Sequence, residues 1–242
     1  MGYLIAFDGI DASGKTTQAK ILEKKLKGSG KDILYLTFPD YESESSALVK
    51  LYLNGDLGKN PGDVNAYAAS AFFAADRYVS YITKWKEFYD RESSIIFATR
   101  YTTANAVHQL AKLEPTEWDK FLDWLYNYEF EKLKIPKPDL TVLFDMHPDV
   151  AVKLIEDRAK KTNTKKDIHE MNVEYLRKCY EASQYAAKYL GWEKIVCYKK
   201  DEYGVSVPRT EEEISENLFK LVGRADPVAP AMKNRSEKNT WI

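Results

Sequence analysis

The chain begins with the stretch YLIAFDGIDASGKT (residues 3–16), in which an apolar run leads directly into the pattern G-x-x-x-x-G-K-[ST]. Gly9 and Gly14 allow a tight turn whose backbone N–H groups point at phosphate oxygens, and the helix expected to follow adds its positive N-terminal end. Lys15 is expected to reach the β- and γ-phosphates of a nucleoside triphosphate, and the Thr16 hydroxyl to bind the Mg²⁺ that bridges them. The alternative is a plain glycine turn between a strand and a helix. The predicted triphosphate loop consists of Gly9, Ile10, Asp11, Ala12, Ser13, Gly14, Lys15, Thr16 and Thr17.

Short apolar runs alternate with segments of helical period along the rest of the chain. Because these runs are apolar throughout, they suit parallel strands that are covered by helices on both faces. Ligands of such sheets bind at the carboxyl ends of the strands. We therefore predict an α/β fold with a five-stranded parallel sheet and helices on both faces, with strands near residues 3–8, 33–38, 94–98, 140–145 and 194–198.

The segments between these runs have the spacing of apolar residues that is typical of helices. Ser45 and Asp63 are expected to cap the N-termini of the second and third helices. The predicted helices lie near residues 14–27, 45–54, 64–91, 103–113, 116–133, 149–161, 170–190 and 211–222.

Composition narrows the class of protein and of partner. The chain has 242 residues, enough for one large core, and nothing in it requires a second domain. Its 36 basic and 37 acidic residues give a formal net charge of −1, so we expect neither a nucleic-acid partner nor a membrane partner. No apolar run approaches the roughly 20 residues of a membrane span, and no signal segment opens the chain. The two cysteines, Cys179 and Cys197, form no disulfide framework, which favours a cytoplasmic location.

Two segments fall outside the regular pattern. Residues 160–167 (KKTNTKKD) are polar and rich in lysine, which predicts a mobile loop; the alternative is a solvated connection between two helices. Residues 223–242 contain prolines and little periodicity, so we expect a loose tail with no assigned function. Residues 1–222 are expected to form a single domain.

Several weaker motifs follow the triphosphate loop in a fixed order. They are Phe38-Pro39 after the second strand, Phe73-x-x-x-Arg77, Arg100-Tyr101 after the third strand, and a lysine-bearing loop before Asp167-x-x-Glu170. Together with the loop, they make residues 1–222 resemble the thymidylate kinase family. The resemblance implies a P-loop kinase fold with a lysine-rich lid near residues 160–168, a homodimer, and transfer of the γ-phosphoryl group of MgATP to dTMP.

The resemblance also implies roles around the phosphates. Arg100 matches an arginine that clamps the acceptor and the transferred phosphate, a task suited to a bidentate guanidinium; the alternative is an ordinary surface ion pair. In many members the P-loop or the lid supplies a further cation. Because Ala12 occupies the loop position, this role falls to the lid, where Lys165 and Lys166 are the favoured residues. Arg158 matches an arginine that packs against adenine; the alternative is a solvated helix residue.

The acceptor pocket is inferred from the same resemblance. Phe73 and Arg77 project from one helical face and match a pair in which the phenylalanine stacks on thymine and the arginine contacts a base carbonyl. The alternative is a core phenylalanine beside a surface arginine. Asn105 matches a position that reads the thymine ring nitrogen, although an asparagine early in a helix can also be structural. The other acceptor residues are Asp11 at the sugar 3′-hydroxyl, Phe38 and Pro39 at the rim with an X-Pro bond that can be cis, Arg100 at the phosphate, and His108 where relatives carry tyrosine near the sugar.

Two further positions depart from the family pattern. Thr99 stands where members commonly carry an aspartate, so Mg²⁺ is expected to depend on Thr16, phosphates and water, with Asp8 as an outer acceptor. Tyr41 lies where many relatives place a phosphate-binding arginine, which leaves the acceptor phosphate more dependent on Arg100. These departures leave two alternatives to a dTMP kinase: a related nucleoside or nucleotide kinase with another acceptor, and a nucleotide-binding module without turnover.

Overall fold

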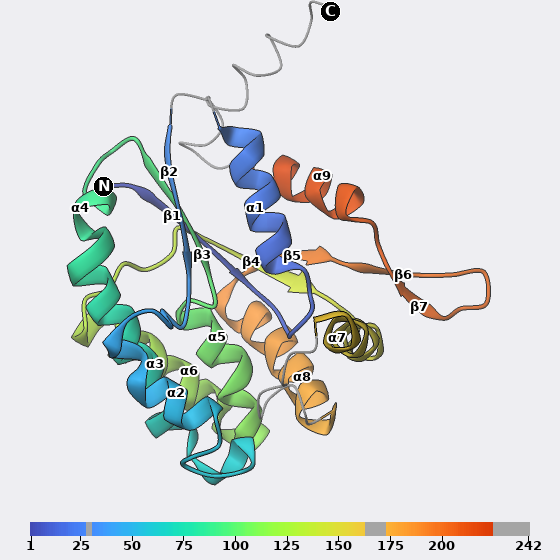
Figure 1. Ribbon diagram of the computed structural model, residues 1–242, viewed down its shortest axis with the longest axis horizontal. Coiled ribbons are helices and arrows are strands. Elements are labelled where there is room, and N and C mark those ends of the chain that lie inside the picture. Colours follow the sequence, from blue (N-terminus) through green and yellow to red (C-terminus); the bar gives the residue numbers. More distant parts are fainter. Residues whose placement is uncertain (28–30, 163–172, 225–242) are drawn as a thin grey trace, which may run out of the picture.

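The centre of the molecule is a five-stranded parallel sheet, which confirms the predicted α/β fold (Figure 1). The structure, a computed structural model, describes residues 1–27, 31–162 and 173–224. The strand order is β2-β3-β1-β4-β5, so the first strand occupies the middle of the sheet and is paired on both sides. The strands are β1 (Tyr3–Asp8), β2 (Asp32–Thr37), β3 (Ser94–Thr99), β4 (Leu140–Asp145) and β5 (Glu193–Val196).

Side chains of β1 alternate between two apolar cores, because successive residues of a strand point to opposite faces. Ile5 and Phe7 belong to the larger core, which includes Leu22 of α1 (Lys15–Leu26). Leu4 belongs to a second core that includes Trp85. Each of these side chains is at most 1% exposed, and burial of each contributes about 2 kcal/mol relative to an exposed position. Both faces of the sheet are therefore covered, as predicted.

The helices lie close to their predicted positions, and two of them contain a π-helical stretch. The first runs from α3 (Ala66–Ser80) through Tyr81–Trp85 into α4 (Lys86–Tyr89), and the second continues α6 (Trp118–Tyr126) through Asn127–Lys132. Such stretches change the register of side chains along a helix and occur often at functional sites. The other helices are α2 (Ala47–Leu53), α5 (Thr102–His108), α7 (Pro148–Thr162), α8 (Val173–Leu190) and α9 (Glu211–Val222). In the part of the chain that the structure describes, none of the helices has the length and apolarity needed to span a membrane.

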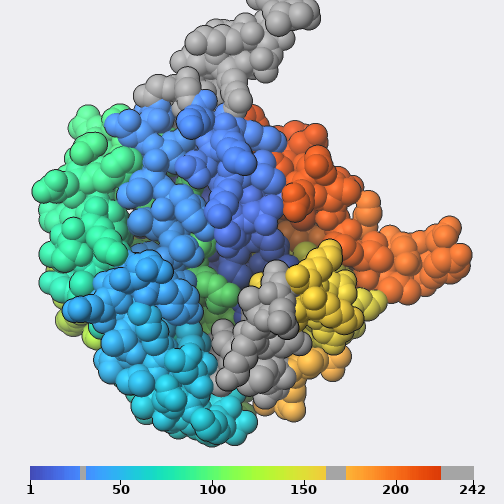
Figure 2. Space-filling view, viewed as in Figure 1, coloured from blue at the N-terminus to red at the C-terminus, as the bar shows by residue number. Residues whose placement is uncertain are grey.

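A two-stranded antiparallel hairpin, β6 (Tyr198–Lys200) and β7 (Ser206–Pro208), was not predicted. The last predicted strand was extended too far, because the main sheet ends at Val196 and the chain then enters the hairpin. Asp201 closes the turn, since its Oδ1 accepts hydrogen bonds from the backbone N–H groups of Tyr203 at 2.9 Å and Val205 at 2.8 Å. Figure 2 shows the hairpin projecting to the right of the described surface.

The two predicted helix caps were both wrong by two residues. The side chain of Ser43, not Ser45, accepts from the backbone at the start of the 3₁₀ turn that precedes α2. Asn65 caps α3, because its Oδ1 accepts from the N–H of Ala68 at 2.8 Å, and a cap of this kind contributes about 1 kcal/mol. Asp63 instead accepts from backbone N–H groups in the preceding short turn.

Candidate active site

The predicted triphosphate loop connects β1 to α1 in the conformation that its glycines allow. Gly14 has φ +87° at the start of α1, and Gly9 has φ +148°. A side chain at Gly9 would place its Cβ 2.6 Å from the carbonyl oxygen of Phe144, so this position requires glycine for close approach as well as for its backbone angle. Ala12 also has a positive φ, +60°. The loop therefore turns tightly and directs α1 with its N-terminal end at the cleft.

Lys15 lies inside this loop with little contact to solvent. Its side chain is 4% exposed, and Nζ donates to the carbonyl oxygens of Gly9 at 3.0 Å and Ile10 at 3.1 Å. Burial, together with the nearby charge of Arg100, lowers the pKa of Lys15 to about 8. An anion placed against Nζ would favour the charged form and reverse this shift.

A cleft of about 360 Å³ opens beside the loop. Of the residues predicted for the triphosphate site, Asp11 through Thr17 and Arg158 on α7 line this cleft. Gly9 and Ile10 do not line it, and their carbonyl oxygens accept from Lys15. Pro208 and Arg209 also line the cleft and were missed, because the hairpin that carries them there was not predicted. Arg209 is held in place by hydrogen bonds from its guanidinium to the carbonyl oxygens of Val196 and Glu213.

Asp8, the predicted outer acceptor for a metal, is fully buried at the end of β1. Its Oδ1 accepts from the N–H of Gly9 at 2.8 Å, and its Oδ2 accepts from the Thr103 hydroxyl at 2.6 Å. Burial raises the pKa of Asp8, although the charge of Lys15 opposes the shift. Asp8 therefore ties the loop to α5 and does not face the cleft, which it does not line.

The groups that can hold a magnesium ion are few. Within residues 1–27, 31–162 and 173–224, no cluster of three or more acidic, histidine or cysteine side chains could hold a metal. Thr16 is exposed and lines the cleft. The Thr99 hydroxyl is turned toward β2, where it lies 3.1 Å from the Tyr35 hydroxyl. Mg²⁺ commonly binds through one or two protein groups plus phosphates and water, so the cleft fits a metal that arrives with the triphosphate.

A second pocket, of about 280 Å³, lies at the carboxyl ends of β2 and β3. It contains most of the residues predicted for an acceptor, and the Phe38-Pro39 bond at its rim is cis, as anticipated. His108 lies in its wall with Nδ1 3.6 Å from the sulfur of Cys179. The lining residues are Thr37, Phe38, Pro39, Tyr41, Leu53, Phe73, Arg100, Ala104, Asn105, His108 and Gln109.

Arg100 lines both this pocket and the cleft beside the triphosphate loop. It follows β3 directly with φ +58°, and its Nη2 forms an ion pair with Oδ1 of Asp11. The Arg100 side chain is 34% exposed and that of Asp11 is 3% exposed. The buried Asp11 carboxylate therefore holds a guanidinium that is partly open to solvent. The guanidinium therefore lines two cavities at once, which the predicted clamp requires, and it does so within a partly exposed ion pair.

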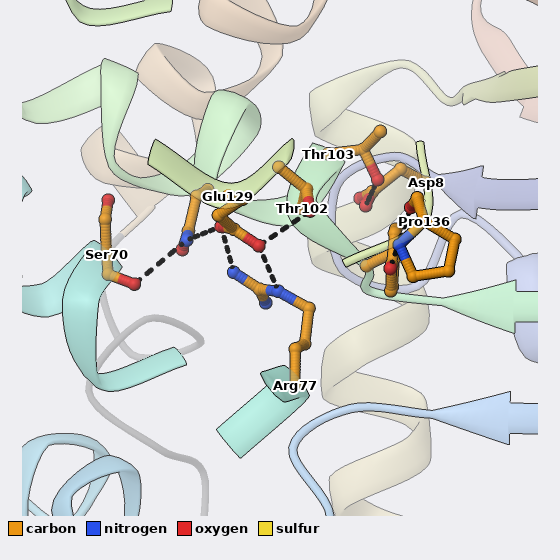
Figure 3. A network of polar contacts seen from close by, with 9 residues as sticks. Asp8, Ser70, Arg77, Thr102, Thr103, Glu129 and Pro136 are labelled. Carbon is orange, nitrogen blue, oxygen red and sulfur yellow. Dashed lines mark hydrogen bonds and ion pairs between the residues drawn. The ribbon is translucent and has the colours of Figure 1, made fainter. Parts of the chain in front are cut away.

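Arg77 is buried behind the pocket, with 1% of its surface exposed, and is not on the helix surface. Its Nε and Nη2 donate to the two carboxylate oxygens of Glu129 at 2.7 and 2.5 Å (Figure 3). Phe73, one turn earlier, lines the pocket, but Arg77 does not. Glu129 was missed because nothing in the sequence connects two residues that are 52 positions apart.

Gln109 is a second pocket residue that was missed. It is fully buried in the wall of the pocket, and neither polar atom of its side chain has a hydrogen-bond partner in the described part of the chain. A buried amide without partners is costly, so the Gln109 side chain is a candidate contact for a ligand of this pocket or for an ordered water. The sequence analysis predicted Asn105 and His108 for this pocket, and Gln109 is the residue after His108.

Two of the predicted catalytic lysines cannot be placed. Lys165 and Lys166, with most of the predicted lid, lie outside the described residues, as does nearly all of the predicted tail. Lys160 of the same predicted segment is described and lies in the last turn of α7, the helix that also carries Arg158 into the cleft.

Comparison with known proteins agrees with this geometry. A family model described as thymidylate kinase matches residues 7–203, from the central strand to the β6–β7 hairpin. The chain belongs to the thymidylate kinase family. The thymidylate kinase of Mycobacterium tuberculosis is 30% identical over 161 residues, which cover 65% of this chain and 72% of that protein. That of Caenorhabditis elegans is 29% identical over 161 residues, which cover 62% of this chain and 66% of that protein.

Among solved structures, the thymidylate kinase of Candida albicans superposes with a TM-score of 0.63 at 20% sequence identity, over 92% of each chain. At this identity the likeness supports the fold alone. It confirms the predicted P-loop kinase fold, in which the loop after the central strand faces the carboxyl ends of its neighbours.

The lowered pKa of Lys15 predicts that the protein takes up protons when it binds MgATP. Near pH 8 about half of the free enzyme carries a neutral Lys15, and phosphates at Nζ favour the charged form. Calorimetric titration at pH 8 in two buffers with different ionisation enthalpies should report an uptake approaching about half a proton per ATP bound. The uptake should vanish at pH 6.5 and in Lys15→Met, and an equal uptake at both pH values would contradict the assignment.

Proposed function

We propose that the protein transfers the γ-phosphoryl group of MgATP to dTMP, giving dTDP and ADP. The position of Arg100 carries this proposal, since its side chain lines both the triphosphate cleft and the second pocket. Phosphoryl transfer requires a donor and an acceptor held in line and a cation at the moving group, and little other chemistry from the protein. Within the described part of the chain, Arg100 is the residue that lines both cavities, and its guanidinium supplies that cation.

The donor occupies the cleft beside the triphosphate loop. Lys15 and the loop N–H groups hold the β- and γ-phosphates, and α1 adds its positive end. Arg158 and Arg209 line this cleft, and we expect them to contact the adenine and the ribose. The Thr16 hydroxyl would bind a Mg²⁺ that arrives with the phosphates, and the ion would supply positive charge at the transferred group. The lid lysines Lys165 and Lys166 are expected to add positive charge at the same place.

The acceptor occupies the second pocket with its phosphate toward Arg100. The ring of Phe73 and the cis Phe38-Pro39 rim enclose the base, while Asn105 and Gln109 supply polar groups to its edge. Asp11 accepts a hydrogen bond from the sugar 3′-hydroxyl, and His108 forms part of the pocket wall near the sugar. Arg77 is buried next to this pocket. Its Nε and Nη2 donate to Glu129, so Nη1 is the guanidinium nitrogen that Glu129 does not bind.

Two copies of the chain are proposed to form a homodimer through α2 and α3, which pack against each other. Leu48 and Leu51, three residues apart on α2, are 47% and 42% exposed. Tyr78 near the end of α3 and Ile82 in the π-helical stretch that follows it are 40% and 48% exposed. Exposed apolar stripes on neighbouring helices are typical of protein interfaces. Sedimentation equilibrium should give twice the chain mass of 27.9 kDa, and a mass of one chain at micromolar concentration would contradict the dimer.

A panel of acceptors tests the proposed reaction. Coupled ADP release should be measured with MgATP and each of dTMP, dUMP, dGMP, dCMP, UMP and thymidine, with a reaction lacking acceptor as the control. The enzyme should prefer dTMP clearly, because a site with matched polar groups discriminates strongly against a base that leaves them unpaired. Preference for another nucleotide would keep the chemistry and reassign the pocket. No stimulation by any acceptor would favour a nucleotide-binding module.

Replacement of Arg100 should separate binding from transfer. Arg100→Ala should lower kcat by about 10³-fold, the scale on which an arginine stabilises the transferring phosphoryl group. Arg100→Lys should restore only part of this loss, because an ammonium cannot make two parallel hydrogen bonds. Arg91→Ala, at an exposed arginine outside both cavities, serves as the control. A kcat for Arg100→Ala within tenfold of the wild type would exclude the proposed clamp.

A further inference from the structure

Glu129 gathers four hydrogen-bond donors behind the acceptor pocket (Figure 3). It lies on the π-helical stretch that follows α6 and is fully buried. Its Oε1 accepts from Nη2 of Arg77 at 2.5 Å and from Nδ2 of Asn105 at 3.2 Å. Its Oε2 accepts from Nε of Arg77 at 2.7 Å and from the Thr102 hydroxyl at 2.7 Å. Both carboxylate oxygens are therefore occupied by donors from α3 and α5.

This arrangement determines which end of the Asn105 amide faces the pocket. Nδ2 of Asn105 donates to Glu129 on one side and to the backbone oxygen of Ser70, 3.3 Å away, on the other. A carboxylate accepts and cannot donate, so the opposite orientation would set the amide oxygen of Asn105 against an anion. Asn105 lines the acceptor pocket, and the atom it can offer there is the oxygen, Oδ1.

We propose that Glu129 is a positioning residue that makes the enzyme select bases carrying a ring N–H next to a carbonyl, that is, thymine and uracil over cytosine. Thymine donates from its N3–H to Oδ1 of Asn105, whereas cytosine has an acceptor at N3 and would oppose it. The proposal rests on the proposed function only in placing the base against Asn105. Arg77 has a related part, because its ion pair with Glu129 compensates the burial of the carboxylate and holds it in place against Asn105.

Glu129→Gln tests this role while preserving shape. A glutamine offers one acceptor group and one donor group to four donors, so the orientation of Asn105 is no longer enforced. The ratio of kcat/KM for dTMP to that for dCMP should fall at least tenfold, mainly through a higher KM for dTMP, while the KM for ATP stays within twofold of wild type. Glu131→Gln, two residues along and 65% exposed, should leave the ratio unchanged.

The outcomes distinguish this role from a general structural one. Equal losses with dTMP and dCMP, or a raised KM for ATP, would overturn the proposal, because misfolding does not choose between bases. If Glu129→Gln does not fold, the same kcat/KM ratio should be measured for Thr102→Val. This variant removes one hydrogen-bond donor to the carboxylate and leaves the Arg77 ion pair intact. A ratio reduced at least threefold supports the role, and an unchanged ratio overturns it. A wild-type enzyme that does not prefer dTMP would instead overturn the proposed function.

Discussion

The ion pair between Arg100 and Asp11 joins the two halves of the site. Asp11 belongs to the loop after β1, and Arg100 follows β3, the strand that pairs with β1 in parallel register. Because parallel neighbours end at the same edge of the sheet, the pair places a cation between the donor cleft and the acceptor pocket. Arg100 adopts a left-handed backbone conformation, φ +58°, which costs a non-glycine residue about 1 kcal/mol. That conformation turns its side chain toward Asp11 at the point where both cavities meet.

Behind this pair, the first turn of α5 connects the two cavities through buried hydrogen bonds. Thr102 donates to Glu129, on the acceptor side, and Thr103 donates to Asp8, at the base of the triphosphate loop. Successive residues of a helix point about 100° apart, so neighbouring side chains can reach opposite partners. Each of these contacts satisfies a buried carboxylate that would otherwise be costly. The positions of loop and pocket are thus set by the same rigid turn, which suits a reaction that depends on alignment.

The strands and the triphosphate loop were predictable because local sequence determines them. Apolar runs form strands wherever helices cover both faces, and the loop requires glycine at Gly9 and Gly14 for its backbone angles. The β6–β7 hairpin was missed because its strands are short and partly exposed, with Gly204 in the turn as the main signal. Helix caps failed by two residues because several small polar residues precede α2 and α3, and tertiary packing selects among them.

Within the site, the sequence predicted which residues line the cavities better than how their side chains are held. Asn105 and Phe73 do line the acceptor pocket, whereas Arg77 was expected to lie beside Phe73 and instead pairs with Glu129. That pairing links α3 to the segment after α6, and no helical or strand period relates residues so far apart. Gln109 became visible only through its burial without partners.

The proposed reaction requires that the two cavities, which share Arg100, act as a single site. A bisubstrate dinucleotide, adenosine joined to thymidine through a chain of five phosphates, tests this most directly by calorimetric titration in the presence of Mg²⁺. One molecule should bind per chain, far more tightly than ATP or dTMP alone, and either nucleotide should compete with it; Arg100→Ala should weaken its binding more than that of ATP. Competition by only one of the two nucleotides, or an affinity no better than that of ATP, would contradict the account.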